Sequence, residues 1–180
     1  EQAFSTPGGV HYALGARPGK VALLFPGQGS QYLEMGAELA LAFEPARAVW
    51  DMAAALPLDP PLHEVVHPRP VFSQSAREQQ EQRLTATEWA QPAIGAASLA
   101  YLALVKKLGI APQAVGGHSF GEVTALYAAG VIDLPSLVRV ARRRGELMAE
   151  AATIPGSMSA VGNSIDEVRP ADYDALIVPG

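Results

Sequence analysis

A serine with glycines two residues away on either side, GHSFG at 117–121, restricts the fold of this 180-residue chain more than any other feature. A short strand-like segment, 113–117, precedes the serine, and a helical pattern, 120–129, follows it. This spacing is typical of a sharp strand-to-helix turn, where larger side chains would collide around a strained serine. The turn exposes the hydroxyl and directs helix N–H groups toward it. Ser119 is therefore a candidate nucleophile; the alternative is a tight turn that merely contains a serine.

Apolar runs alternate with helical patterns along the chain, which predicts an α/β fold with a parallel sheet. Four prolines make 58–71 an irregular surface segment in this interpretation, and 1–19 is a linker or lead-in. Ser30, Thr87 and Asp133 are expected to cap helices. The predicted strands are 21–25 (buried), 113–117, 156–161 and 175–178, and the predicted helices are 32–43, 45–56, 76–84, 85–108, 120–129 and 134–152.

Composition excludes several classes of function. Hydrophobic residues make up 49% of the chain and the net charge is −5, which argues against a nucleic-acid binder with a basic face. The chain has no cysteine, so disulfides and thiolate–zinc sites are excluded. No signal peptide and no apolar run of membrane-spanning length is present, so we expect a cytoplasmic location and no membrane contact.

A second glycine-rich motif, PGQGSQ at 26–31, directly follows the first predicted strand. The carboxyl ends of parallel strands meet at one edge of a sheet, so this loop is expected near the serine turn. Gln28, between two glycines, could offer its backbone N–H to an oxyanion. The alternatives are a flexible turn or a weak phosphate loop, and the phosphate loop is disfavoured because no lysine follows the glycines.

Four motifs in order resemble the acyl-CoA:acyl-carrier-protein transacylases. They are FPGQGSQ, WAQPAIGAASLAYL from Trp89, GHSFGE, and RRGELMAEA followed by GSMSAVG, so the resemblance runs from about residue 20 to about 161. The family contains the malonyl transacylases of fatty-acid synthesis and the acyltransferase domains of polyketide and polyunsaturated-fatty-acid synthases. Four spaced motifs are far more specific than the serine turn alone.

The resemblance implies a role for each matching residue. Ser119 resembles the nucleophile that accepts the acyl group, and the backbone N–H groups of Gln28 and Phe120 resemble the oxyanion hole. Gln91 resembles a glutamine that lines the substrate pocket. Arg144 matches an arginine that pairs with the free carboxylate of a malonyl group.

Arg144 carries the prediction of substrate class. A guanidinium can hold a carboxylate through two parallel hydrogen bonds. Without the motif, the arginines at 142–144 would be interpreted as a solvated helix face. His118 is expected at the edge of the substrate pocket or in a packing role, since neighbouring residues at the turn point in different directions. The remaining histidines are expected in exposed loops; they are His11, His63 and His67.

A serine nucleophile needs a base, normally a histidine, to take its proton. The resemblance implies that this histidine lies after a small inserted subdomain, yet no histidine follows His118 in the sequence. The stretch 165–180 also matches the family poorly. The chain could be a fragment, half of a divided enzyme, or a core that has lost the subdomain, and we favour a fragment.

The resemblance implies an enzyme that moves a malonyl or related dicarboxylic acyl group from CoA to the phosphopantetheine thiol of an acyl carrier protein. It implies a hydrolase-like α/β core at 20–155 and the incomplete start of a ferredoxin-like subdomain at 156–180. No metal or redox cofactor is needed, and a ketosynthase and other synthase domains are plausible neighbours. The alternatives are a serine hydrolase or thioesterase on the same turn, and an incomplete core with a docking role.

Overall fold

The structure is a computed structural model that describes residues 3–15 and 19–153. By its internal contacts the chain divides into two units, Glu1–Glu150 and Ala151–Gly180, and nearly all described residues belong to the first. The predicted strands at 156–161 and 175–178 lie outside the described residues. The boundaries at 19, 155 and 156 therefore remain predictions.

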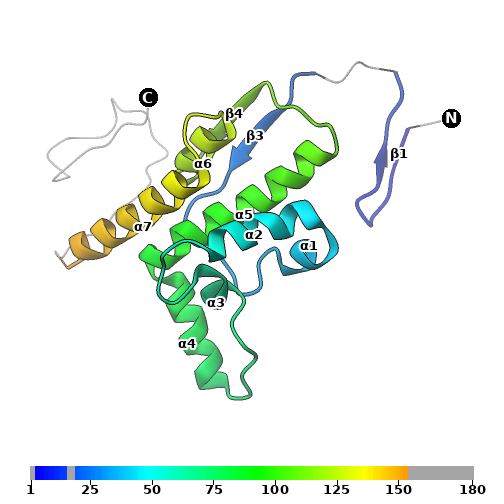
Figure 1. Cartoon of the computed structure of the whole chain (residues 1–180). Coiled ribbons are helices and arrows are strands. Elements are labelled where there is room, and N and C mark those ends of the chain that lie inside the picture. The colour runs from blue at the N-terminus through cyan, green and yellow to red at the C-terminus, as the bar shows by residue number, and fades with distance from the viewer. Residues whose placement is uncertain (1–2, 16–18, 154–180) are drawn as a thin grey trace, which may run out of the picture. The chain divides into compact units, whose positions relative to one another are not determined.

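Helices dominate the described residues (Figure 1). None of these helices combines the length and apolar character that crossing a bilayer requires. The elements in chain order are β1 (Phe4–Ser5), β2 (His11–Tyr12), β3 (Ala22–Phe25), α1 (Ala37–Ala42), α2 (Glu44–Ala54), α3 (Leu62–Val66), α4 (Gln74–Thr85), α5 (Thr87–Lys107), β4 (Ala114–Gly117), α6 (Gly121–Ala128) and α7 (Leu134–Ala151).

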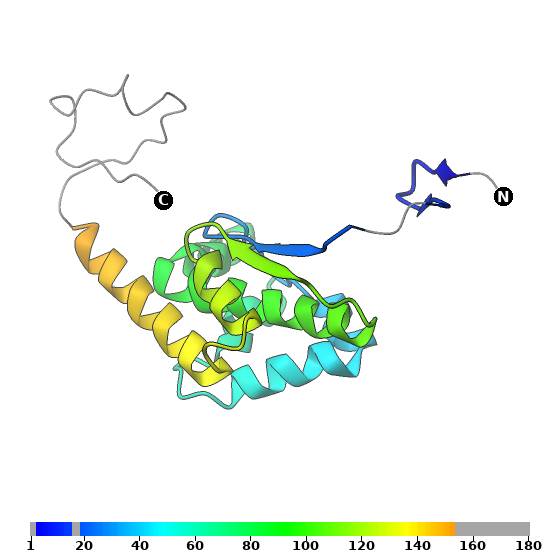
Figure 2. The ribbon, with the colours of Figure 1, turned by 90° about the horizontal axis from the view of Figure 1, so that it is seen from above.

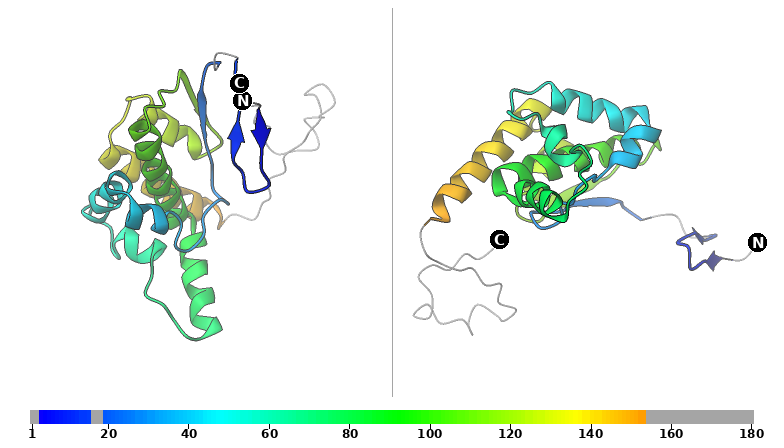
Figure 3. Two further views of the ribbon diagram at one scale, coloured as in Figure 1. Left: turned by 90° about the vertical axis from the view of Figure 1, so that its right-hand side faces the viewer. Right: turned by 90° about the horizontal axis from the view of Figure 1, so that it is seen from below.

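Strands β3 and β4 pair in parallel, which confirms the predicted strand direction. The pairing begins at Ala22 with Ala114 and ends at Phe25 with Gly117, so both strands end at the same edge. The described helices lie on one side of this two-stranded sheet (Figures 2 and 3). Phe25 points to that side, where it packs with Leu102 of α5.

The prediction that the first strand is buried is wrong for the described residues. Leu24 is 81% exposed, because no described element covers the face of β3 opposite the helices. Buried parallel strands are normally covered on both faces. The apolar run at 21–25 therefore predicted the strand correctly and its burial incorrectly.

The core centres on α5, which contacts α2, α3, α4 and α6. Small residues on α5 allow close packing: a Cβ added at Gly95 would lie 2.8 Å from a methyl carbon of Leu137 and 3.3 Å from the Phe120 ring. Leu137 and Phe120 are both fully buried. The residue that follows the candidate nucleophile is thus anchored in the core of the helical layer.

The helix predicted at 32–43 is wrong in its first half, since α1 begins only at Ala37. Glu34 and Gly36 have φ of 65° and 76°, outside the helical region. The Glu34 N–H donates to the Val66 carbonyl at 2.8 Å, so a tertiary contact replaces a helical hydrogen bond. Ser30 caps no helix; its hydroxyl donates to the Gly27 carbonyl at 2.9 Å.

Two segments expected to be irregular contain regular structure. In the proline-rich segment, α3 forms because its three apolar residues, Leu62, Val65 and Val66, are spaced to face the core and are buried. In the lead-in, β1 and β2 form a short antiparallel hairpin.

The loop assignment is wrong for two of the three remaining histidines, and the third, His67, lies in a bend but is not exposed as expected. His11 lies in β2 and His63 in α3. His67 follows α3 and is half-buried, with its ring 4.7 Å from the Trp50 ring. Burial lowers the pKa of His67, and the Glu34 carboxylate opposes that shift.

The other predicted helices match α2, α4, α5, α6 and α7 within two or three residues at each end. Asp133 caps α7 as predicted, because its Oδ1 accepts from the Ser136 N–H at 2.8 Å. Gly109 and Gly130 end α5 and α6 with φ of 76° and 78°. The predicted cap of α5 is wrong: Ala86 is the N-cap, and Thr87 is the first residue of the helix.

Candidate functional site

The backbone around Ser119 has the strained turn that the sequence predicts. Ser119 has φ of 54°, in the left-handed region that residues with a side chain rarely adopt. A Cβ at Gly117 would overlap the backbone of Gly121, and a Cβ at Gly121 would overlap the Phe25 carbonyl. Both glycines are therefore required by backbone contacts, and the serine is exposed between them.

The PGQGSQ loop lies against this turn, so the two glycine motifs share one site. A Cβ added at Gly27 would lie 2.5 Å from the His118 carbonyl oxygen and 3.2 Å from Ser119 Cβ. Neither the Gln28 nor the Phe120 backbone N–H has a hydrogen-bond acceptor within the described residues. Two unpaired N–H groups next to an exposed hydroxyl are the arrangement that a developing oxyanion requires.

Arg144 of α7 reaches the same serine. Its Nη2 lies 3.4 Å from Ser119 Oγ, a long hydrogen bond, and its Nη1 is buried with no partner among the described residues. The two preceding arginines differ: Arg142 pairs with Glu146 at 2.8 Å, and Arg143 pairs with Glu146 at 3.2 Å. Arg144 is thus the member of this arginine cluster that has no carboxylate partner in the described part of the chain.

The partners of Glu146 keep it ionised. Hydrogen bonds from Arg142 and Arg143 hold the pKa of the Glu146 carboxyl below its usual range. The alternative interpretation of a solvated arginine face therefore describes Arg143 alone. Arg142 is partly buried against the Trp89 ring, and the guanidinium of Arg144 is partly buried and points at the serine.

The side chains of the other two predicted site residues make no hydrogen bond to Ser119 among the described residues. His118 is exposed, and its backbone N–H donates to the Phe25 carbonyl at 3.1 Å. Gln91 is fully buried, with its Nε2 3.3 Å from Met148 Sδ and its Oε1 unpartnered in the described residues. Their roles toward a substrate remain predictions.

Sequence reasoning missed the residues that hold the site together at the start of α5. Thr87 accepts a hydrogen bond from the Gln28 side chain, and Arg142 Nη1 donates to the Glu88 carbonyl at 3.4 Å. Pro92 was the available signal for the contact of Arg142 with Glu88. A proline has no N–H, so the carbonyl four residues earlier, that of Glu88, lacks its helical donor.

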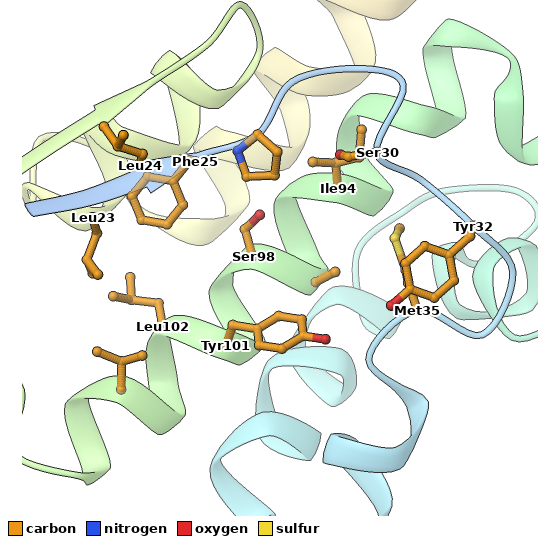
Figure 4. Close-up of a pocket in the computed structure, with 13 residues that line it drawn as sticks. Leu23, Leu24, Phe25, Ser30, Tyr32, Met35, Ile94, Ser98, Tyr101 and Leu102 are labelled. Atoms are coloured by element: carbon orange, nitrogen blue, oxygen red, sulfur yellow. The ribbon is translucent and has the colours of Figure 1, made fainter. Parts of the chain in front are cut away.

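A separate apolar groove of about 340 Å³ lies beside β3 (Figure 4). Tyr101 and Leu102 of α5 line it together with Leu23 of β3. Ser119 and Arg144 are not among its lining residues, so this groove is not the site of the serine chemistry. The described residues also contain no group of three acidic or histidine side chains that could hold a metal ion.

Comparison with known proteins gives a consistent result. The family model of the acyl transferase domain matches residues 22–179. The chain is 40% identical to the malonyl CoA-acyl carrier protein transacylase of Bacillus subtilis, over 79% of this chain and 42% of that protein. It is 37% identical to a phenolphthiocerol synthesis polyketide synthase type I of Mycobacterium marinum, over 97% of this chain and 8% of that protein.

A solved structure agrees with these sequence relatives. It contains a malonyl-transacylase in complex with its type II polyketide synthase acyl-carrier protein, and it is similar with a TM-score of 0.63 and 39% identity. The alignment covers 74% of this chain and 40% of that chain. The chain therefore spans less than half the length of these relatives.

Proposed function

This chain belongs to the acyl transferase domain family, and we propose that it carries the nucleophile and the substrate-binding arginine of a malonyl-transfer site. The observation that supports this most directly is Arg144, whose Nη2 lies 3.4 Å from Ser119 Oγ and whose buried Nη1 has no partner in the described residues. A carboxylate on the bound acyl group would supply that partner.

The acyl group passes through an ester on Ser119. The Ser119 oxygen attacks the thioester carbonyl of malonyl-CoA, and the N–H groups of Gln28 and Phe120 stabilise the resulting oxyanion. A base takes the Ser119 hydroxyl proton during the attack. The carbon–sulfur bond then breaks, the base passes that proton to the CoA thiolate, and malonyl-serine remains. The phosphopantetheine thiol of a carrier protein attacks this ester, which regenerates the serine hydroxyl and leaves a new thioester.

Arg144 favours a short dicarboxylic acyl group for two reasons. A buried donor without an acceptor costs about 1–3 kcal/mol, and a carboxylate removes that cost through a charge-assisted hydrogen bond. The guanidinium is also close to the nucleophile, at 3.4 Å from Ser119 Oγ. A short acyl group that ends in a carboxylate can therefore engage the serine and the guanidinium at once.

The base for Ser119 lies outside the described contacts of the serine. No described histidine ring hydrogen-bonds Ser119 Oγ, and the sequence has no histidine after His118. The family resemblance implies that the base follows a small inserted subdomain, so our proposal assigns no residue of this chain as the base. An added base such as imidazole should then raise the rate of serine acylation.

The wider context belongs to the same proposal. The described parallel strands and their helices would form part of a hydrolase-like α/β core, with a ferredoxin-like subdomain that begins near residue 156. The acyl carrier protein seen with the related malonyl-transacylase suggests the same class of acceptor here. The polyketide synthase relative suggests a ketosynthase as a neighbouring domain. The reaction requires no permanently bound cofactor.

The experiment is intact-protein mass spectrometry after incubation with malonyl-CoA, with and without imidazole. We expect a malonyl adduct that imidazole accelerates, that Ser119→Ala abolishes, and that passes to a phosphopantetheinylated carrier protein. An adduct that is lost only to water would instead identify a hydrolase. Absence of any adduct under both conditions would contradict the proposed function.

A further inference from the structure

The first turn of α5 contacts both the loop that carries Gln28 and the helix that carries Arg144. On one side, Gln28 Nε2 donates to Thr87 Oγ1 at 3.2 Å. On the other side, a Cβ added at Gly145 would lie 2.5 Å from the Thr87 carbonyl oxygen and 2.5 Å from Glu88 Cα. The oxyanion loop and the helix that carries Arg144 are therefore both fitted against the same turn.

The contact with α7 is reinforced around Glu88. Arg142 Nη1 donates to the Glu88 carbonyl at 3.4 Å, and the Arg142 guanidinium lies 4.4 Å from the centre of the Trp89 ring. Both interactions link α7 to α5 close to Arg144. The remaining part of the site is the glycine-rich loop that carries Gln28.

Apart from the close approach of Gly27 to the serine turn, few hydrogen bonds hold that loop in place. Two of its hydrogen bonds are internal: the Gly29 N–H to Gln31 Oε1 at 2.8 Å, and the Ser30 hydroxyl to the Gly27 carbonyl at 2.9 Å. Among the described contacts of residues 26–31, the bond from Gln28 to Thr87 is the one hydrogen bond that reaches another element. The side chain of Gln28 is exposed, so this bond does not serve core packing.

We propose that Thr87 is a positioning residue for the reaction: its hydroxyl holds the Gln28 side chain and thereby keeps the Gln28 backbone N–H directed at the oxyanion. This inference rests on the proposed function of the Gln28 amide. The hydroxyl acts on the transition state through the loop and touches no substrate. Its loss should therefore slow acylation of Ser119 and leave the binding of malonyl-CoA unchanged.

The test compares Thr87→Val, which keeps the shape and removes the hydroxyl, with Thr87→Ser, which keeps the hydroxyl. We expect Thr87→Val to lower the maximal rate of malonyl loading about tenfold, less than the 10²–10³ loss for removing an oxyanion donor outright. The malonyl-CoA concentration for half-maximal loading should stay within about twofold, as expected for an interaction made only in the transition state. Thr87→Ser should load at close to the wild-type rate.

A matched control is Thr85→Val, because the Thr85 hydroxyl donates to the Glu81 carbonyl at 2.8 Å and contacts no part of the loop. This variant should leave loading unchanged. Gln28→Met removes the same bond from the other side while leaving the backbone N–H in place. It should match Thr87→Val, and the double variant should be no slower than either single one. Additive losses would overturn the proposal.

Amide hydrogen exchange of residues 26–31 separates this inference from the proposed function. Thr87→Val should speed exchange in this loop, whereas Thr87→Ser and Thr85→Val should not. If the wild-type chain did not load malonyl at all, the proposed function would fail and the exchange data alone would decide whether Thr87 positions the loop. Equal behaviour of Thr87→Val and Thr87→Ser in both measurements would overturn the positioning role.

Discussion

The two sides of β3 differ sharply in packing. On the helical side, Phe120 and Leu137 are fully buried, and Gly95 of α5 is pressed against both. On the other side, Leu24 is 81% exposed and no described element covers it. Among the described residues, the side-chain packing that holds the Ser119 turn is therefore on the helical side, where Phe120 ties the turn to the core.

Close backbone contacts are what set the geometry of the site on the packed side. Gly121 meets the Phe25 carbonyl, Gly27 meets the His118 carbonyl, and Gly145 meets the Thr87 carbonyl. Each contact joins elements far apart in sequence without an intervening side chain. These glycines have no side chain, so the backbones can touch and hold the site in place. The outer face of β3 has no comparable contact among the described residues.

The largest expected effect tests the contrast directly. Leu137→Ala should lower the free energy of unfolding by about 4 kcal/mol, because it leaves a cavity between α5 and α7. Leu24→Ala should change it by less than about 0.5 kcal/mol, because it removes exposed surface only. Urea unfolding followed by circular dichroism measures both. A cost for Leu24→Ala as large as that for Leu137→Ala would mean that the outer face of β3 is covered in solution.

The second test concerns the backbone contacts. Gly121→Ala should cost about 3 kcal/mol, at the upper end for overpacked sites, because its Cβ would overlap the Phe25 carbonyl and neither backbone can move freely. Gly130→Ala is the matched control: its φ is 78° but its added Cβ meets nothing within 4 Å, so only strain of about 1 kcal/mol is expected. Equal costs in urea unfolding would show that the turn relaxes around a side chain.

The third test concerns selectivity for the acyl group. Arg144→Ala should reduce malonyl loading of Ser119 relative to acetyl loading by about tenfold to a hundredfold, because a charge-assisted hydrogen bond contributes about 1.5–3 kcal/mol. Arg143→Ala is the matched control, since Arg143 pairs with Glu146 and should not affect the ratio. Competition between malonyl-CoA and acetyl-CoA, read by mass spectrometry, gives the ratio. An unchanged ratio in Arg144→Ala would remove its assigned role.

Features that depend on local sequence could be predicted. The strained turn at Ser119 follows from glycine spacing, and the parallel direction of the strands follows from alternating strand and helix patterns. The cap at Asp133 follows from its position before a helical pattern. These predictions needed no information on how distant segments meet.

Features set by contacts between distant segments could not be predicted. The first half of the helix predicted at 32–43 does not form, because the Glu34 N–H donates to the Val66 carbonyl. No local sequence pattern indicates that pair. Thr87 looked like a helix cap, yet its hydroxyl binds Gln28, which is 59 residues away in sequence. Leu24 looked buried because its apolar neighbours indicate a covered strand, whereas coverage depends on which elements pack against it.

The smallest expected effect concerns the ion pairs that Glu146 forms with Arg142 and Arg143 on α7. Hydrogen bonds from Arg142 and Arg143 lower the pKa of Glu146, so the folded state binds this proton less tightly than the unfolded state. The stabilisation is therefore fully present above about pH 4.5, the ordinary pKa of a glutamate. It is lost as the pH falls through the lower pKa of Glu146 in the folded state. Glu146→Gln should be less stable than wild type at neutral pH and should approach it below that value. Urea unfolding at several pH values measures this difference in stability. If the difference stayed constant from neutral to acidic pH, the charge of the Glu146 carboxylate would not be what stabilises α7 through its two arginines.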